Sequence, residues 1–156
     1  MTHHDHQDDR RSVTMSEIMT PDMVNFYGNV HGGYLLKLLD RVAYVCASRY
    51  SGKPTVTLSV DQVVFKEPIH VGELVTFYAS VNYVGKTSME IGIRVVAEDF
   101  FKNQTRHTNT CYFTMVAIDE KGKPTAVPPL TIENETHQQR KDAALLRKEA
   151  RLKIKK

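Results

Sequence analysis

A glycine-rich turn that runs directly into an apolar helix is the feature that most constrains how this chain can fold. The turn covers residues 25–33, and its last two residues, Gly32 and Gly33, stand where the helix should begin. Glycine there lets another group approach backbone N–H donors that have no acceptor inside the helix. Those donors lie at the positive end of the helix dipole, which favours a carbonyl oxygen that gains negative charge, or a phosphate. We therefore expect Gly32 and Gly33 to bind an oxyanion.

The helix that follows is predicted to run from Gly33 to about Tyr50, with apolar residues on most of its sides. Such a helix must be enclosed, here by a sheet. It carries one acid, Asp40, among leucines, valines and alanines. A lone carboxylate in such a stretch is costly unless it is paired, solvated in a cleft or used in chemistry. Asp40 is therefore a candidate catalytic residue.

The spacing between the turn and Asp40 predicts an assembly. Two helical turns separate Gly33 from Asp40, a rise of roughly 10 Å at about 1.5 Å per residue, whereas catalytic contacts are about 3 Å long. One chain's turn and its own Asp40 therefore cannot hold the same reacting carbon. If both serve one reaction, the turn of one copy must face Asp40 of another, which predicts a homodimer with shared sites.

Outside this helix, most of the chain is predicted to form strands joined by short turns. One short alternating segment precedes the glycine-rich turn, and four longer apolar segments follow the helix. Neighbours joined by short turns pair antiparallel, so we expect an α+β domain with one sheet and a single helix packed on one face. The predicted strands span residues 13–18, 56–65, 74–84, 89–101 and 108–118.

Length and composition fit one globular domain, with 156 residues of which 41% are hydrophobic and 25% are charged. No apolar run is long enough to span a bilayer, and the first residues lack the basic-then-apolar order of a signal peptide. We therefore expect a cytoplasmic protein with no membrane span. The two cysteines, Cys46 and Cys111, lie in apolar stretches and are expected to be buried free thiols.

The net charge of +3 is distributed unevenly along the chain. Eight basic residues and two acids fall between residues 140 and 156, so this stretch carries +6 and the remainder carries −3. We expect residues 131–156 to form a basic amphipathic helix or tail, able to contact nucleic acid, a membrane surface or a phosphorylated ligand. No aromatic residue follows Phe113, which argues against base stacking, and no nucleic-acid partner is predicted.

The first eleven residues, 1–11, are polar and are expected to form a disordered arm. His3, His4 and His6 stand close enough in the sequence to chelate a metal ion. Nothing nearby fixes a ligand geometry, so a solvated arm is favoured and no metal site is predicted.

Four ordered motifs resemble the acyl-CoA thioesterases of the hotdog fold, in particular the cytosolic long-chain and brain-type acyl-CoA hydrolases and their single-domain bacterial relatives. The motifs are Gly-Asn-Val-His-Gly-Gly at 28–33 followed by Asp40, Val-Asp-x-x-x-Phe-x-x-Pro at 60–68, Gly-Lys-Thr-Ser-Met at 85–89, and Phe-Thr-x-Val-Ala-x-Asp at 113–119. The likeness covers residues 12–130. It implies one hotdog domain there, a long central helix wrapped by a curled antiparallel sheet, with the C-terminal helix as an addition.

This resemblance implies hydrolysis of fatty acyl-CoA to a free fatty acid and CoA, with no metal and no cofactor beyond the CoA of substrate and product. It implies that Asn29 and Asp40 are catalytic, Asp40 as the general base for water or as a nucleophile. The N–H groups of Gly32 and Gly33 would stabilise the oxyanion, with His31 in support. In two-repeat relatives the asparagine and the aspartate come from different repeats. A chain with both therefore implies a homodimer, assembled further as a trimer of dimers.

The hairpin turn at 85–88 is a polar loop that can meet the nucleotide end of CoA, and the basic tail can hold one of its phosphates. The predicted CoA-binding residues are Gly85, Lys86, Thr87, Ser88 and Arg140. Asp61, on a predicted strand, is either a supporting acid or simply exposed.

A non-catalytic acyl-CoA-binding sensor on the same fold is the alternative to an enzyme. Such a sensor needs no base, and the presence of Asp40 argues against it.

Overall fold

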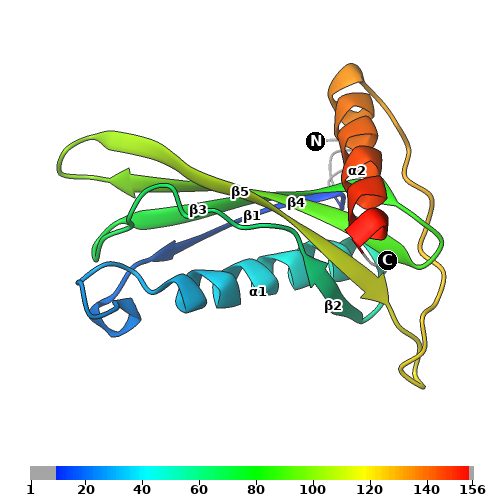
Figure 1. Ribbon diagram of the computed structural model, residues 1–156, viewed down its shortest axis with the longest axis horizontal. Coiled ribbons are helices and arrows are strands. Elements are labelled where there is room, and N and C mark those ends of the chain that lie inside the picture. Colours follow the sequence, from blue (N-terminus) through cyan, green and yellow to red (C-terminus); the bar gives the residue numbers. More distant parts are fainter. Residues whose placement is uncertain (1–9, 155–156) are drawn as a thin grey trace, which may run out of the picture.

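The computed structural model describes residues 10–154, and its core is a curled sheet that wraps one long helix (Figure 1). The order along the chain is β1 (Ser12–Ile18), a 3₁₀ turn η1 (Pro21–Met23), α1 (Gly32–Ser51), β2 (Thr55–Val60), β3 (Leu74–Val84), β4 (Ser88–Asp99), β5 (Gln104–Ala117) and α2 (Glu135–Ile154). The five strands form one antiparallel sheet in the order β1-β3-β4-β5-β2. The predicted hotdog fold and the additional C-terminal helix are confirmed.

Helix α1 has a defined cap at each end. The His31 side chain accepts a hydrogen bond from the Gly33 N–H at the N-terminus. Gly52 ends the helix in the left-handed region at φ 68°, and its N–H donates to the Ser48 carbonyl. A glycine is favoured there because it carries no Cβ. The caps fix the helix to Gly32–Ser51, one residue longer at each end than predicted.

The core lies between α1 and the concave face of the sheet. Alternate residues of β4 and β5 point inward, and each buried apolar side chain contributes roughly 1.5–3 kcal/mol. The core side chains with almost no exposure include Leu39, Val42, Phe77, Ile91, Ile93, Phe113 and Met115. Both cysteines, Cys46 and Cys111, are buried and free, as predicted.

The predicted strand 56–65 is too long, because β2 ends at Val60. The Asp61 N–H still donates to the Tyr112 carbonyl, and beyond this bond the chain leaves the sheet. The apolar run 63–65 packs against the start of α1 instead. The Phe65 ring lies 3.5 Å from where a side chain on Gly32 would begin. An apolar run this short does not distinguish a strand from a covering loop.

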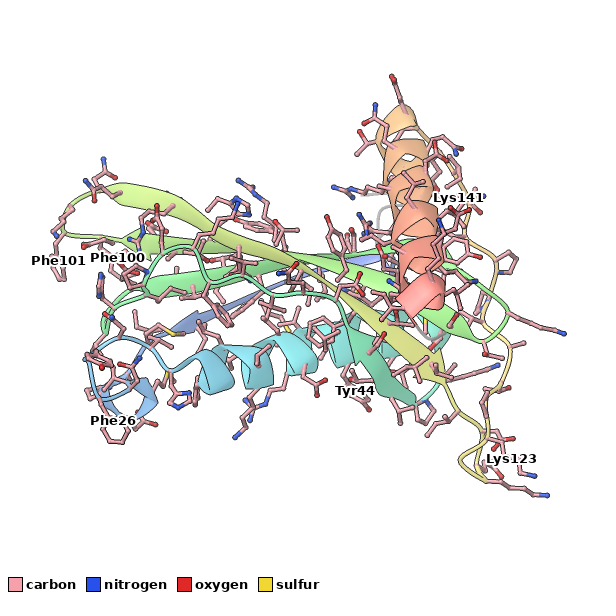
Figure 2. The ribbon with its side chains drawn as sticks, viewed as in Figure 1. Phe26, Tyr44, Phe100, Phe101, Lys123 and Lys141 are labelled. Carbon is pink, nitrogen blue, oxygen red and sulfur yellow. The ribbon has the colours of Figure 1, made fainter. Side chains whose placement is uncertain are left out.

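Helix α2 packs on the convex face of the sheet, on the side away from α1 (Figure 1). Arg147 of α2 lies over the Tyr112 ring at 3.5 Å from its centroid. Tyr112 alternates with the inward residues Cys111 and Phe113, so its side chain points outward. The exposed Phe26, Phe100 and Phe101 lie at the opposite end of the molecule (Figure 2).

Within residues 10–154, neither helix is both long enough and apolar enough to cross a membrane. His3, His4 and His6, with most of the predicted N-terminal arm, lie outside the described residues.

Candidate active site

The turn that precedes α1 is held by a network around Asn25. The Oδ1 atom of Asn25 accepts from the Tyr27 N–H at 2.9 Å and from the Asn29 N–H at 3.2 Å, and the Asn25 N–H donates to the Asn29 carbonyl at 2.7 Å. Gly28, at φ 80°, occupies the tip of this turn. Asn29 is half-buried beside His70, with which it forms an isolated backbone bridge. The sequence analysis did not single out Asn25, although asparagine is a residue type that organises such turns.

His31 and the two glycines form the start of α1. The Nδ1 atom of His31 accepts from the Gly33 N–H at 2.9 Å, which leaves the ring proton of the neutral imidazole on Nε2. A side chain on Gly33 would lie 3.1 Å from that Nδ1 atom, so glycine keeps the cap open. The Tyr34 and Leu35 N–H groups both donate to the His31 carbonyl. Gly32 therefore supplies the first-turn N–H that remains available for a substrate.

Asp40 lies on an exposed side of α1 and accepts a hydrogen bond of 2.6 Å from the Thr57 hydroxyl of β2. The Thr57 hydroxyl also lies 3.5 Å from the sulfur of Met115, the residue opposite it on β5. Thr57 was not predicted as a site residue, because alternation within a strand does not reveal which helix residue its side chain will meet. The carboxylate is open to water and held in place by one donor, the arrangement that a general base needs.

Asp40 belongs to a stripe of exposed residues on α1. Leu36 and Tyr44 stand one turn before and one turn after it, and they are 38% and 48% exposed. The neighbouring strand β2 forms an edge of the sheet and exposes Val56, Leu58 and Val60. The carboxylate thus lies between two exposed apolar side chains of α1, two helical turns from the glycine-rich turn of the same chain.

The predicted CoA-binding residues divide into two places. In the hairpin turn between β3 and β4, the Gly85 N–H donates to the Ser88 carbonyl at 2.8 Å and the Lys86 side chain is exposed. Arg140 does not lie beside this hairpin turn. It contacts Ser80 at 3.4 Å and lines a different groove, shared with Tyr78 and Arg94.

Asp61 is not simply exposed, because it pairs with Arg151 of α2 at 3.0 Å. Next to this pair, Glu90 is almost fully buried and accepts two hydrogen bonds from Arg147, at 2.7 and 3.0 Å. Burial acts to lower the pKa of Arg147, but the hydrogen bonds and charge of Glu90 outweigh it, so the pKa is raised. These two pairs fasten α2 to the sheet.

Among the residues that the structure describes, no three His, Cys, Asp or Glu side chains gather as metal ligands.

Comparison with known sequences gives two results. The sequence model of the thioesterase superfamily matches residues 27–99, which include most of the glycine-rich turn but not Asn25, together with Asp40, Thr57 and the hairpin turn. Protein VdlD of Helicobacter pylori is 54% identical over 143 residues, which cover 92% of this chain and 82% of that protein.

Two solved structures share the fold over nearly the whole chain. A hexameric acyl-CoA thioesterase, in its apo form, has a TM-score of 0.89 and 32% identity and covers 93% of each chain. The acyl-CoA hydrolase of Staphylococcus aureus, in complex with butyryl-CoA, CoA and CoA disulfide, has a TM-score of 0.84 and 30% identity, covering 92% of this chain and 88% of that one. Variants of the same hydrolase with alanine in place of an aspartate, an asparagine or a threonine are also known.

Proposed function

Because the chain belongs to the thioesterase superfamily and is an acyl-CoA thioester hydrolase, we propose that it cleaves fatty acyl-CoA at sites formed between two copies of the chain. The products are a free fatty acid and CoA. We expect no metal or other cofactor to take part, so dialysis against EDTA should leave the rate unchanged.

The observation that carries this proposal is the Asp40–Thr57 pair. A thioester carbonyl is already electrophilic, so hydrolysis needs a base for water and a donor for the oxyanion. Asp40 is exposed, and the hydroxyl of Thr57 orients its carboxylate at 2.6 Å. In the proposed mechanism Asp40 takes a proton from water, and the water oxygen attacks the carbonyl carbon. Collapse of the resulting intermediate expels the CoA thiolate, which is protonated as it leaves.

The oxyanion is assigned to the first N–H of α1. Gly32 supplies that N–H, since His31 accepts the hydrogen bonds of the residues that follow. The positive end of the helix dipole favours negative charge at this point. Removing one such donor typically costs roughly 2.7–4 kcal/mol of barrier. The Nε2–H of His31 lies at the same helix end and is a supporting donor.

The second catalytic side chain is assigned to Asn25, with Asn29 as the alternative. In the S. aureus hydrolase the substituted asparagine and aspartate are 15 positions apart, and the aspartate and threonine 17. In this chain Asn25, Asp40 and Thr57 have the same spacing, whereas Asn29 lies four residues closer to Asp40. The Oδ1 atom of Asn25 is engaged by the turn, so its Nδ2 group is the donor that can face a substrate.

Two copies of the chain are needed to bring these groups together. The stripe around Asp40 and the apolar edge strand β2 are a surface on which a second copy can pair. In that arrangement the turn of one copy faces Asp40 of the other. One relative of the same fold is described as hexameric, which fits further assembly as a trimer of dimers.

Release of thiol from acetyl-, butyryl- and palmitoyl-CoA tests the proposed activity. We expect turnover with at least one acyl-CoA, loss of turnover in Asp40→Ala, and a larger loss in Asn25→Ala than in Asn29→Ala. Tight acyl-CoA binding without thiol release would instead identify the sensor.

Mixing inactive chains tests the shared site. Asn25→Ala and Asp40→Ala chains, unfolded and refolded together, should regain about a quarter of the wild-type rate, because half of the randomly formed dimers contain one intact site. Refolding a doubly substituted chain with Asp40→Ala is the control and should regain nothing. No recovery in the first mixture would contradict a site shared between copies.

A further inference from the structure

Of the arginines and lysines of α2, only Arg147 and Arg151 form ion pairs with carboxylates of the described chain. Arg147 pairs with Glu90 at 2.7 Å and Arg151 pairs with Asp61 at 3.0 Å. Lys141 and Lys148 form no ion pair with any carboxylate of residues 10–154. Arg147 and Arg151 therefore fasten the helix, and Lys141 and Lys148 keep their charge available for another partner.

Lys148 lies over the hairpin turn between β3 and β4. Its Nζ atom is 3.5 Å from the Tyr83 hydroxyl and 5.1 Å from the centre of the Tyr83 ring. The same Nζ atom is 3.9 Å from where a side chain on Gly85 would begin. Because Arg147 precedes Lys148, the ion pair with Glu90 fixes the part of the helix that carries this lysine.

Lys141 and Lys86 flank the same hairpin turn. Lys141 stands two helical turns before Lys148, on the same side of α2, and is directed toward the segment that links β5 to α2 (Figure 2). It lines a groove with Gly85 and Lys86 of the hairpin turn and with Ala126, Val127, Pro129 and Leu130 of that segment. Lys86 and Lys141 thus line one groove, and Lys148 lies beside it, over Gly85 of the hairpin turn. Lys86 also forms no ion pair within the described chain.

We propose that Lys86, Lys141 and Lys148 bind the phosphate groups of the CoA portion of the substrate. This inference rests on the proposed hydrolysis of acyl-CoA and assigns the nucleotide end to this groove. Ammonium groups on flexible stems suit phosphates as point charges, and three of them offset most of the charge of a diphosphate with a 3′-phosphate. The site explains why the hairpin turn and α2 meet, and it replaces Arg140 with Lys141 and Lys148 as the residues of α2 that contact CoA.

A comparison of two thioester substrates tests the assignment. Acyl-CoA carries the phosphates, and the matching acyl-pantetheine lacks the nucleotide. Lys148→Gln and Lys141→Gln should each raise the KM for acyl-CoA roughly fivefold, and the triple variant with Lys86→Gln should raise it further. In every case kcat and the KM for acyl-pantetheine should stay at their wild-type values. Lys153→Gln, which removes a charge from another side of α2, is the matched control and should change nothing.

Direct binding of CoA, measured by calorimetry, separates this inference from the proposed function. If the wild-type protein hydrolyses both thioesters but the triple variant binds CoA as tightly as wild type, the lysine site is wrong and the hydrolase stands. If neither thioester is hydrolysed but the variant binds CoA more weakly, the hydrolase is wrong and the lysine site stands. Equal changes for both substrates, or an effect of Lys153→Gln as large as that of Lys148→Gln, would also overturn the assignment.

Discussion

Two carboxylates of this protein sit in opposite environments, although in the sequence each is a single acid among apolar residues. Asp40, on α1, is exposed and accepts one hydrogen bond from Thr57. Glu90, on β4, is 2% exposed and accepts two hydrogen bonds from Arg147 and one from Asn82. The same residue pattern therefore gives a solvent-exposed acid in one place and a buried, paired acid in the other.

The difference follows from solvation. A buried charge must be paired, because moving it out of water costs several kcal/mol unless a partner and hydrogen bonds replace the water. Glu90 meets this condition through an arginine far along the chain, and both of its carboxylate oxygens accept hydrogen bonds. Asp40 retains contact with water and has lone pairs free to accept a proton. Asp40 should thus be essential for rate and of little consequence for stability, and Glu90 the reverse.

Replacing Asp40 with Asn is the strongest test of this difference between the two carboxylates. The amide keeps the shape and can still meet Thr57, but it cannot take a proton from water. We expect kcat to fall by roughly 10²–10⁴-fold, the usual contribution of a general base. The free energy of unfolding, measured with urea, should change by less than about 0.5 kcal/mol. A large loss of stability would mean that Asp40 is a structural acid after all.

Much of the fold could be predicted from the sequence, because hydrophobic periodicity and turn residues are local signals. The apolar helix with a single acid, the antiparallel strands and the basic terminal helix all occur as the patterns indicated. The error at residues 63–65 has a physical cause, since an apolar run that covers α1 and one that enters a sheet have the same composition.

The candidate site could be predicted only in part, because its geometry depends on contacts between distant residues. The start of the helix and Asp40 could be predicted, because paired glycines and a single acid two helical turns later are recognisable in the sequence. Thr57 was not, since nothing in β2 reveals that its hydroxyl meets Asp40. Whether Arg140 or Lys148 faces the proposed CoA-binding groove depends on the rotation of α2 about its own axis. The Arg147–Glu90 pair fixes this rotation, and it joins residues 57 positions apart in the sequence.

Replacing Glu90 with Gln tests the other half of the comparison. The variant leaves the guanidinium of Arg147 without its countercharge. Breaking a buried pair costs about 3–5 kcal/mol, and we expect about 2–3 kcal/mol here because the Arg147 side chain is 24% exposed. Urea unfolding gives this loss, whereas kcat per folded molecule with acyl-pantetheine should be unchanged. Glu149→Gln, at an exposed position of α2, is the control and should stay within about 0.5 kcal/mol of wild type.

Thr57→Val sharpens the comparison, because it removes the donor to Asp40 and keeps the side-chain volume. A hydrogen bond to a charged group is worth about 1.5–3 kcal/mol, and the lower end applies to an exposed pair. We expect kcat to fall about tenfold, with a much smaller change in KM. Thr57→Ser restores the hydroxyl and should recover most of the rate. A loss in Thr57→Ser as large as that in Thr57→Val would show that the hydroxyl alone does not account for the rate.

The buried thiols of Cys46 and Cys111 are weak acids that form no ion pair within the described residues, so they show what burial does to an acid. Burial raises the pKa of Cys46 and of Cys111 to about 12, so both stay protonated in the native state, whereas in the unfolded chain they ionise near 9.0. Above that pH the unfolded chain binds fewer protons than the native one, so stability falls as the pH rises from about 9 toward 12.

Between pH 8 and pH 10, each thiol should cost about 1.4 kcal/mol. Urea unfolding of Cys46→Ala and Cys111→Ala at the two pH values measures this cost within each variant, so the cavity that alanine leaves cancels. Each variant should lose about 1.4 kcal/mol less than wild type over the interval. If the losses are equal, the thiols ionise as readily in the folded protein as in the unfolded chain. That result would mean that burial in this core does not keep an acid protonated. Glu90 could then stay charged without Arg147.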